Sequence, residues 1–196
     1  MYLNKKNSDL KFRYVRDYDL TEVIKIISEY DNEWLEDISR QTGSKHHFRT
    51  MSYHIYWYPL QWCPGDEYVP DFICNDMNLW KYLEPIVKDL EMLYDGKVGR
   101  ATIVNLPAGK LVTPHADDFV YPNVIHRVHI PIITNDGVFF NVDDDTKNLK
   151  VGEAWEVNNA KIHGSYNMGD TPRVHFMVDI IPNSLIGTNK VIGPEG

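Results

Sequence analysis

The sequence has no long hydrophobic run. None of its 196 residues lies in a stretch that approaches the roughly 20 consecutive apolar residues of a membrane-spanning helix. The first ten residues hold Lys5 and Lys6 with no apolar run behind them, so we expect no secretory signal. These two absences predict a soluble protein without a membrane partner.

Cysteine and basic residues are also scarce. Cys63 and Cys74 could close a short loop, but without an export signal we expect free thiols in a reduced, cytoplasmic protein. The chain has 20 Lys and Arg against 28 Asp and Glu, a formal net charge of -8. Because binding to phosphate backbones needs a basic surface, we expect no nucleic-acid partner. The 43% hydrophobic content fits one domain with an ordinary core.

The first half of the chain predicts two helices and an aromatic strand. Apolar residues at helical spacing, starting near Asp19, predict a helix over about residues 20–30. Residues 46–62 are rich in aromatic and β-branched types and favour a strand. A second helix is expected from a cap at Asn75 or Asp76 to Gly96, and Pro85 inside it predicts a kink or a break near Leu83.

After Gly99 the sequence has the texture of short strands separated by turns. We expect strands at residues 101–106, 126–134, 138–142, 154–157, 163–167 and 173–181. This spacing indicates a sandwich or barrel rather than βαβ units. The sequence Asn135-Asp136-Gly137 predicts a hairpin between two of these strands, and Asp143-Asp144-Asp145 is interpreted as a solvated turn.

Three residues form a candidate metal site. His115 and Asp117 make a His-x-Asp pair near a strand end, and His163 follows much later. Two imidazoles and one carboxylate on one face of a metal ion leave positions open, as in non-haem Fe(II) oxygenases. Alone, each element is weak: a His-x-Asp pair arises readily by chance, and His163 could be a structural histidine in a turn.

Two strands of the second half combine an apolar face with a basic one. Alternation along residues 173–181 sets Arg173 opposite Val174, and along residues 127–131 it sets Arg127 and His129 opposite Val128. We expect the apolar faces to pack on the helices and the basic faces to line an interior cavity. Cations at such depth need an anionic partner, and a bound small carboxylate fits this requirement.

With these residues in view, the span 100–181 resembles the aspartyl/asparaginyl β-hydroxylase family of Fe(II)/2-oxoglutarate-dependent dioxygenases. The resemblance depends on segments spread along this span: Pro107-Ala108-Gly109, Pro114-His115-x-Asp117, Arg127-x-His129, Gly152-Glu153-Ala154-Trp155, His163-x-x-x-Asn167, Arg173 and Val178-Asp179. It implies a mainly β fold with N-terminal helices, a double-stranded β-helix of the jelly-roll or cupin type. Residues 1–98 would support a catalytic core at 99–182, and 183–196 would form a tail that is either frayed or a lid.

The resemblance also implies roles for individual residues. His115, Asp117 and His163 would ligate Fe(II), while Arg173 and His129 would hold the distal carboxylate of 2-oxoglutarate. Arg127 would contact the substrate or lie behind the metal ligands. With O2, such a site hydroxylates an amino-acid side chain, free or within a peptide or protein. Asp117 completes a ligand set whose carboxylate some animal members of the family lack, which argues against carrying over the protein substrates of those members to this chain.

Two other functions remain open at this point. One is a non-redox, metal-dependent cupin enzyme, and the other is a jelly-roll module that binds a carboxylate without turnover. The sequence names neither the prime substrate nor the oligomeric state.

Overall fold

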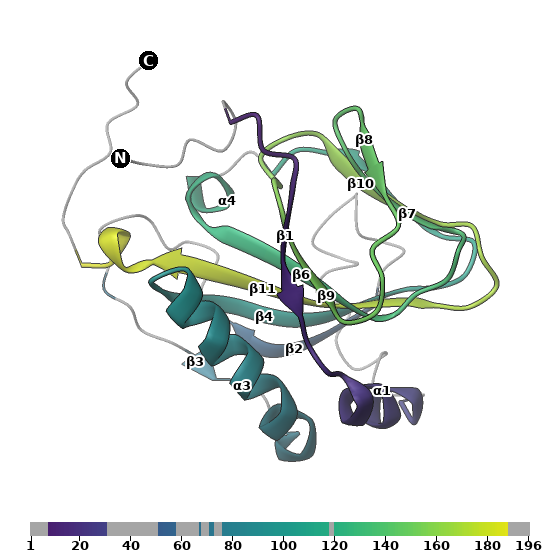
Figure 1. The fold of residues 1–196 in the computed structure, drawn as a ribbon, viewed down its shortest axis with the longest axis horizontal. Coiled ribbons are helices and arrows are strands. Elements are labelled where there is room, and N and C mark those ends of the chain that lie inside the picture. The colour runs from purple at the N-terminus through teal and green to yellow at the C-terminus, as the bar shows by residue number, and fades with distance from the viewer. Residues whose placement is uncertain are drawn as a thin grey trace.

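The computed structural model describes residues 8–30, 51–57, 67, 71–72, 76–117 and 120–187. The described strands form two antiparallel sheets (Figure 1). In spatial order, the large sheet contains β1 (Phe12–Asp17), β9 (Glu153–Val157), β6 (His126–Ile133), β11 (Arg173–Pro182), β4 (Gly96–Leu106), β2 (Met51–Trp57) and β3 (Asp71–Phe72). The small sheet contains β5 (Leu111–His115), β10 (His163–Asn167), β7 (Val138–Val142) and β8 (Asp145–Lys147).

From β4 onward the chain alternates between the two sheets. Among the described strands of this region, only β7 and β8 follow one another within the same sheet. This alternation produces a double-stranded β-helix, or jelly roll, as the family resemblance implied. The interior faces of the two sheets therefore carry residues that lie far apart in the sequence.

Helices cover the outer face of the large sheet. Helix α1 (Thr21–Ser28) and helix α3 (Met77–Leu93) lie on one side of this sheet, and the small sheet lies on the other (Figure 1). Apolar residues of both helices pack on the outward-facing residues of β4, β6 and β11 to form the main core. The fully buried members include Leu79, Leu83, Leu90, Ile130 and Phe176. The predicted contact between apolar strand faces and helices is confirmed.

Helix α3 departs from the sequence prediction at two points. It runs unbroken through Pro85, so the break, one of the two alternatives expected near Leu83, does not occur. Burial of Leu83, Ile86 and Val87 on the sheet outweighs the hydrogen bond that proline cannot make. Asp76 caps the helix, its side chain accepting from the amide of Leu79 at 3.0 Å.

The expected stop at Gly96 is also displaced. The left-handed residue after helix α3 is Asp95, with φ 45°, and Gly96 already begins β4. A Cβ at Gly96 would lie 2.5 Å from both Ile180 Cγ2 and the Ile181 carbonyl oxygen, so glycine permits the close approach of β4 and β11.

The predicted hairpin at Asn135-Asp136-Gly137 is wrong. The turn forms, with Asn135 Oδ1 accepting from the amide of Gly137 at 2.9 Å, but it joins β6 of the large sheet to β7 of the small sheet. Turn chemistry fixes the reversal of the chain locally, whereas the partner of each strand depends on long-range packing. The hairpin occurs one connection later, where β7 pairs with β8 through the exposed turn at Asp143 and Asp144.

Several elements were not predicted: β1, β5, β8 and the short helix α4 (Val120–Val124). Strand β1 pairs with β9, so residues before the predicted core complete one edge of the large sheet. After β11, the 3-10 helix η3 (Asn183–Leu185) packs Leu185 against Tyr121, Val124 and Ile181. The start of the predicted tail is therefore packed, and residues 188–196 lie outside the described part. Of the aromatic segment at 46–62, the structure describes only β2, and the remaining residues lie outside the described part.

We predict that Leu83→Ala lowers the free energy of unfolding by about 2–5 kcal/mol, because it opens a cavity at a fully buried position. Met92→Ala, on the same helix at 76% exposure, is the matched control and should change it by less than about 0.5 kcal/mol. Urea unfolding of both variants measures the difference. Equal effects would contradict the packing of helix α3 on the sheet.

Candidate metal centre

The pairing of β5 with β10 brings two histidines together. His115 ends β5, His163 begins β10, and the two are register partners in the antiparallel ladder. Their ring centroids lie 4.4 Å apart. A Cβ at Gly164 would lie 3.0 Å from the Val112 carbonyl oxygen and 3.3 Å from Pro114, so glycine at this position allows the close approach of the two strands.

Asp117 completes the group from the loop after β5. Its amide donates to the Asn159 carbonyl at 3.0 Å, which ties this loop to the turn before β10. Asp117 Oδ1 lies 3.5 Å from His115 Nε2, and one potential ligand atom from each of His115, Asp117 and His163 lies within 4.8 Å of the others. The three residues predicted as ligands therefore form a cluster compatible with a single metal ion.

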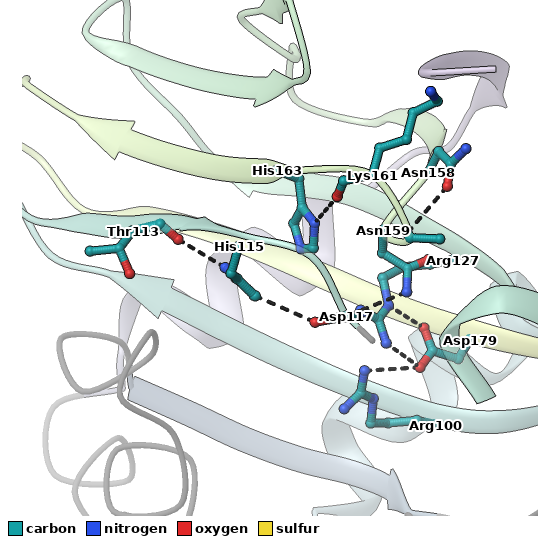
Figure 2. Close-up of polar contacts among 11 residues, drawn as sticks. Arg100, Thr113, His115, Asp117, Arg127, Asn158, Asn159, Lys161, His163 and Asp179 are labelled. Carbon is teal, nitrogen blue, oxygen red and sulfur yellow. Dashed lines mark hydrogen bonds and ion pairs between the residues drawn. The ribbon is translucent and has the colours of Figure 1, made fainter. Parts of the chain in front are cut away.

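Backbone contacts fix the orientation of both imidazoles. His115 Nδ1 lies 2.8 Å from the Thr113 carbonyl oxygen, and His163 Nδ1 lies 3.0 Å from the Lys161 carbonyl oxygen (Figure 2). A carbonyl only accepts, so Nδ1 carries the proton in each ring and Nε2 presents its lone pair. This tautomer leaves Nε2 of both rings as the metal-binding nitrogen.

The local environment favours the protonation states that metal ligands require. Burial lowers the pKa of His163 to about 4, so its imidazole is neutral at physiological pH. Burial alone would raise the pKa of Asp117, but the Arg127 guanidinium and the two histidines hold it well below its usual value. An ionised carboxylate beside a neutral imidazole is ready to bind a divalent cation.

Arg127 lies directly behind Asp117. Its Nη1 donates to Asp117 Oδ2, while Nε and Nη2 donate to the two oxygens of Asp179 at 2.7 and 3.0 Å (Figure 2). Asn159 Nδ2 donates to the same Asp117 oxygen at 3.2 Å. Of the two roles that the resemblance implied for Arg127, these contacts fit the one behind the metal ligands.

Arg173 and His129 line the same cavity as the three ligands. The Arg173 side chain is buried and donates from Nη2 to His175 Nδ1 at 2.8 Å. Burial lowers the pKa of Arg173 to about 9, and no carboxylate in the described part of the chain pairs with it. Its Nε has no hydrogen-bond partner. A buried guanidinium of this kind requires an anionic partner, which the described residues do not supply.

Ser165 is a further cavity residue that sequence reasoning missed. It is 2% exposed, its hydroxyl has no hydrogen-bond partner, and it lines the cavity with Arg173. Buried hydroxyls without a partner are uncommon in folded proteins. A signal was present, because Ser165 lies two residues after His163 and strand alternation places both on one face.

Comparison with known proteins agrees with this geometry. The sequence profile of the aspartyl/asparaginyl beta-hydroxylase family matches residues 71–182, more than half of the chain. The chain belongs to the aspartyl/asparaginyl β-hydroxylase family. L-proline cis-4-hydroxylase of Rhizobium meliloti (strain 1021) is 28% identical over 99 residues, which are 50% of this chain and 34% of that protein. The match thus spans about a third of the length of this relative.

Solved structures share the fold of this β-hydroxylase family member at low sequence identity. A non-heme monooxygenase, ThoJ, in a nickel complex superposes with a TM-score of 0.55 and 14% identity, covering 92% of this chain and 77% of that one. AviO1 from Streptomyces viridochromogenes Tue57 superposes with a TM-score of 0.53 and 15% identity, covering 89% of this chain and 91% of that one. A 2OG-Fe(II) oxygenase family oxidoreductase from Burkholderia pseudomallei superposes with a TM-score of 0.51 and 12% identity, covering 70% of each chain. These likenesses support the jelly-roll fold.

In the part of this β-hydroxylase family member that the structure describes, no helix is both long and apolar enough to span a membrane.

We predict that the metal-free protein loses stability as the pH falls from about 6.5 to 4. His163 has a folded-state pKa of about 4 against 6.5 unfolded, so in this range the unfolded chain binds more protons. The corresponding loss is about 3 kcal/mol from His163. The buried His175, whose pKa burial also lowers, acts in the same direction.

Urea unfolding of the metal-free protein at pH 7, 5.5 and 4.5 measures this dependence. His163→Gln should make the dependence shallower, because one buried group no longer takes up a proton on unfolding. An identical slope in wild type and variant would contradict a buried neutral His163.

Proposed function

We propose that this chain is an Fe(II)/2-oxoglutarate-dependent dioxygenase that hydroxylates an amino-acid side chain, either free or in a peptide. The observation that carries the proposal is a cluster of two imidazole nitrogens and a carboxylate that shares one cavity with the buried Arg173, with which no carboxylate among the described residues pairs. Family membership and the proline hydroxylase relative support the same reaction class. The non-redox cupin and the binding module are not favoured by these findings.

The residues fit Fe(II) by the chemistry of the donors. Two neutral imidazoles and one anionic oxygen are the donor set of non-haem iron oxygenases, and a cage of three protein ligands leaves positions for other molecules. His115, Asp117 and His163 would hold the ion. When bound, the iron and its keto-acid co-substrate supply the oxidising chemistry, with 2-oxoglutarate converted to succinate and CO2 as O2 is consumed.

The chain's own residues bind and orient the co-substrate. Arg173 offers a planar guanidinium that matches a carboxylate, and His175 holds the fork in place through its hydrogen bond to Nη2. Ser165 adds a hydroxyl, and His129 lines the same cavity. Phe140 lies under the guanidinium, with Arg173 Cζ 5.5 Å from the ring centroid, and keeps this end of the cavity apolar.

The decisive experiment is a substrate screen with the purified protein. Fe(II), ascorbate, 2-oxoglutarate and O2 should give slow succinate release, which free amino acids such as L-proline, or short peptides, should stimulate. Mass spectrometry should find the stimulating compound one oxygen atom heavier. Metal-dependent turnover without O2 consumption would favour the non-redox cupin, and ligand binding without any turnover would favour the binding module.

We predict that Arg173→Lys raises the KM for 2-oxoglutarate about tenfold or more, with a smaller effect on kcat. A lysine is a point charge and cannot reproduce two parallel hydrogen bonds to a carboxylate, and a charged hydrogen bond contributes roughly 1.5–3 kcal/mol. Steady-state succinate formation at varied 2-oxoglutarate measures the change.

Arg16→Lys is the matched control for this substitution. Arg16 lies on β1 at the outer edge of the large sheet and pairs with Asp89, so its replacement should leave the KM for 2-oxoglutarate unchanged. A wild-type KM in Arg173→Lys would assign the co-substrate carboxylate to another residue.

A further inference from the structure

A row of three charged residues crosses the interior face of the large sheet. Asp179 on β11 is the register partner of Arg127 on β6 and of Arg100 on β4. Asp179 is fully buried and Arg127 is 6% exposed. Arg100 Nη2 lies 2.9 Å from Asp179 Oδ2, so the carboxylate is held between guanidinium groups from both neighbouring strands (Figure 2).

Asp179 determines which part of Arg127 reaches the metal centre. Its two oxygens engage Nε and Nη2, one complete edge of the guanidinium. Because the group is planar and rigid, this contact leaves Nη1 directed at Asp117. Arg127 therefore makes a single contact with Asp117 rather than the two-oxygen fork that an unrestrained arginine prefers.

The single contact separates the two oxygens of Asp117. Oδ2 accepts from both Arg127 Nη1 and Asn159 Nδ2, whereas Oδ1 faces His115 Nε2 at 3.5 Å. A carboxylate whose second oxygen takes two hydrogen bonds offers the other oxygen to a metal ion. One-oxygen binding by Asp117 would preserve positions on the ion for other ligands.

The charges of this row and of Asp117 together are balanced without the metal. Arg100 and Arg127 carry two positive charges, and Asp117 and Asp179 carry two negative ones. Burial alone would raise the pKa of Asp179, but Arg100 and Arg127 hold it below its usual value, so the carboxylate is ionised. Without Asp179, an excess positive charge would lie beside a divalent cation, where the cavity screens it poorly.

We propose that Asp179 is a positioning residue which acts through Arg127 to present Oδ1 of Asp117 alone to the metal ion. This inference rests on the proposed function only in requiring a divalent ion at the three ligands. Asp179 itself contacts neither the ion nor its ligands, and its effect passes through the guanidinium.

The test is metal affinity measured without co-substrate or O2. Calorimetric titration with Co(II) should give a Kd for Asp179→Asn roughly 10- to 100-fold weaker than for wild type, the usual loss when a partner behind a metal ligand is removed. The visible absorption of bound Co(II) should change as well. Arg127, once released from Asp179, can bind both oxygens of Asp117 and then competes with the ion for Oδ1. A Kd within twofold of wild type in the folded variant would overturn the proposal.

Glu156→Gln is the matched control. Glu156 is 1% exposed on β9 of the same sheet and pairs with Arg13 and His126, so the substitution likewise neutralises a buried, arginine-paired carboxylate. This cluster does not line the cavity, and Co(II) affinity should stay within twofold of wild type. Equal loss of Co(II) affinity in both variants would mean that Asp179→Asn acts through general destabilisation, and it would overturn the proposal.

A double-mutant cycle isolates the route through Arg127. In an Arg127→Met background, Asp179→Asn should cause little further loss of Co(II) affinity, since the residue that transmits its effect is gone. Full additivity would overturn the proposal. If Asp179→Asn does not fold, Arg127→Lys replaces it: one ammonium keeps the charge but cannot reproduce the fork, so the Kd should weaken, and a wild-type Kd would count against the inference.

These outcomes separate the two proposals. A wild-type protein that binds no Co(II) would contradict the metal centre and with it the proposed function. Wild-type binding that is unaffected by Asp179→Asn would contradict only the positioning role.

Discussion

The structure depends on how two neighbouring strands, β6 and β11, bury charge. Their outward side chains are apolar and pack on α1 and α3, while their inward side chains include Arg127, His129, Arg173 and Asp179. Because a buried cation is costly, each arginine must find a negative partner. Arg127 finds two within the chain, and Arg173 finds none among the described residues. The same strand pair thus builds one end of the cavity where the arginine is paired and another where it has no carboxylate partner among the described residues.

The two ends of the cavity would have different roles in the proposed reaction. At one end, the carboxylates of Asp117 and Asp179 pair with Arg127 and Arg100, and these contacts orient Asp117. At the other end, Arg173 and Ser165 retain hydrogen-bonding capacity in an apolar surrounding formed by Phe140 and Met177. A keto diacid that joins the ends would contact the metal centre with one carboxylate and Arg173 with the other.

Much of the site was accessible from the sequence because its ligands lie in short motifs. His115 and Asp117 are two residues apart, and strand alternation alone placed Arg127, His129 and Arg173 on inward faces. Strand β10 was predicted with its bounds at His163 and Asn167, since turn residues mark both ends. In the structure, potential ligand atoms of His115, Asp117 and His163 lie within 4.8 Å of one another, so the segments that carry these three residues meet in space.

The missed features depend on register or on very short elements. Asp179 and Arg127 are 52 residues apart, and their pairing follows only from the alignment of β6 with β11. The Asn159 contact with Asp117 likewise requires the turn before β10 to lie against the loop after β5. Strand β8 has three residues and β5 contains Pro114, so neither gave a readable pattern. Strand β1 lies at the sheet edge with a register shift between Tyr14 and Arg16, and its residues do not alternate between apolar and polar types.

The two histidine contacts to backbone carbonyls have a consequence of their own. Each imidazole is oriented by the carbonyl of the residue two positions earlier in the chain, Thr113 for His115 and Lys161 for His163. The direction of both lone pairs is thus encoded within two tripeptides and not by distant parts of the barrel. A change in the separation of β5 and β10 would alter the distance between the two Nε2 atoms. Each ring would still present Nε2, because its Nδ1 stays bound to the local carbonyl.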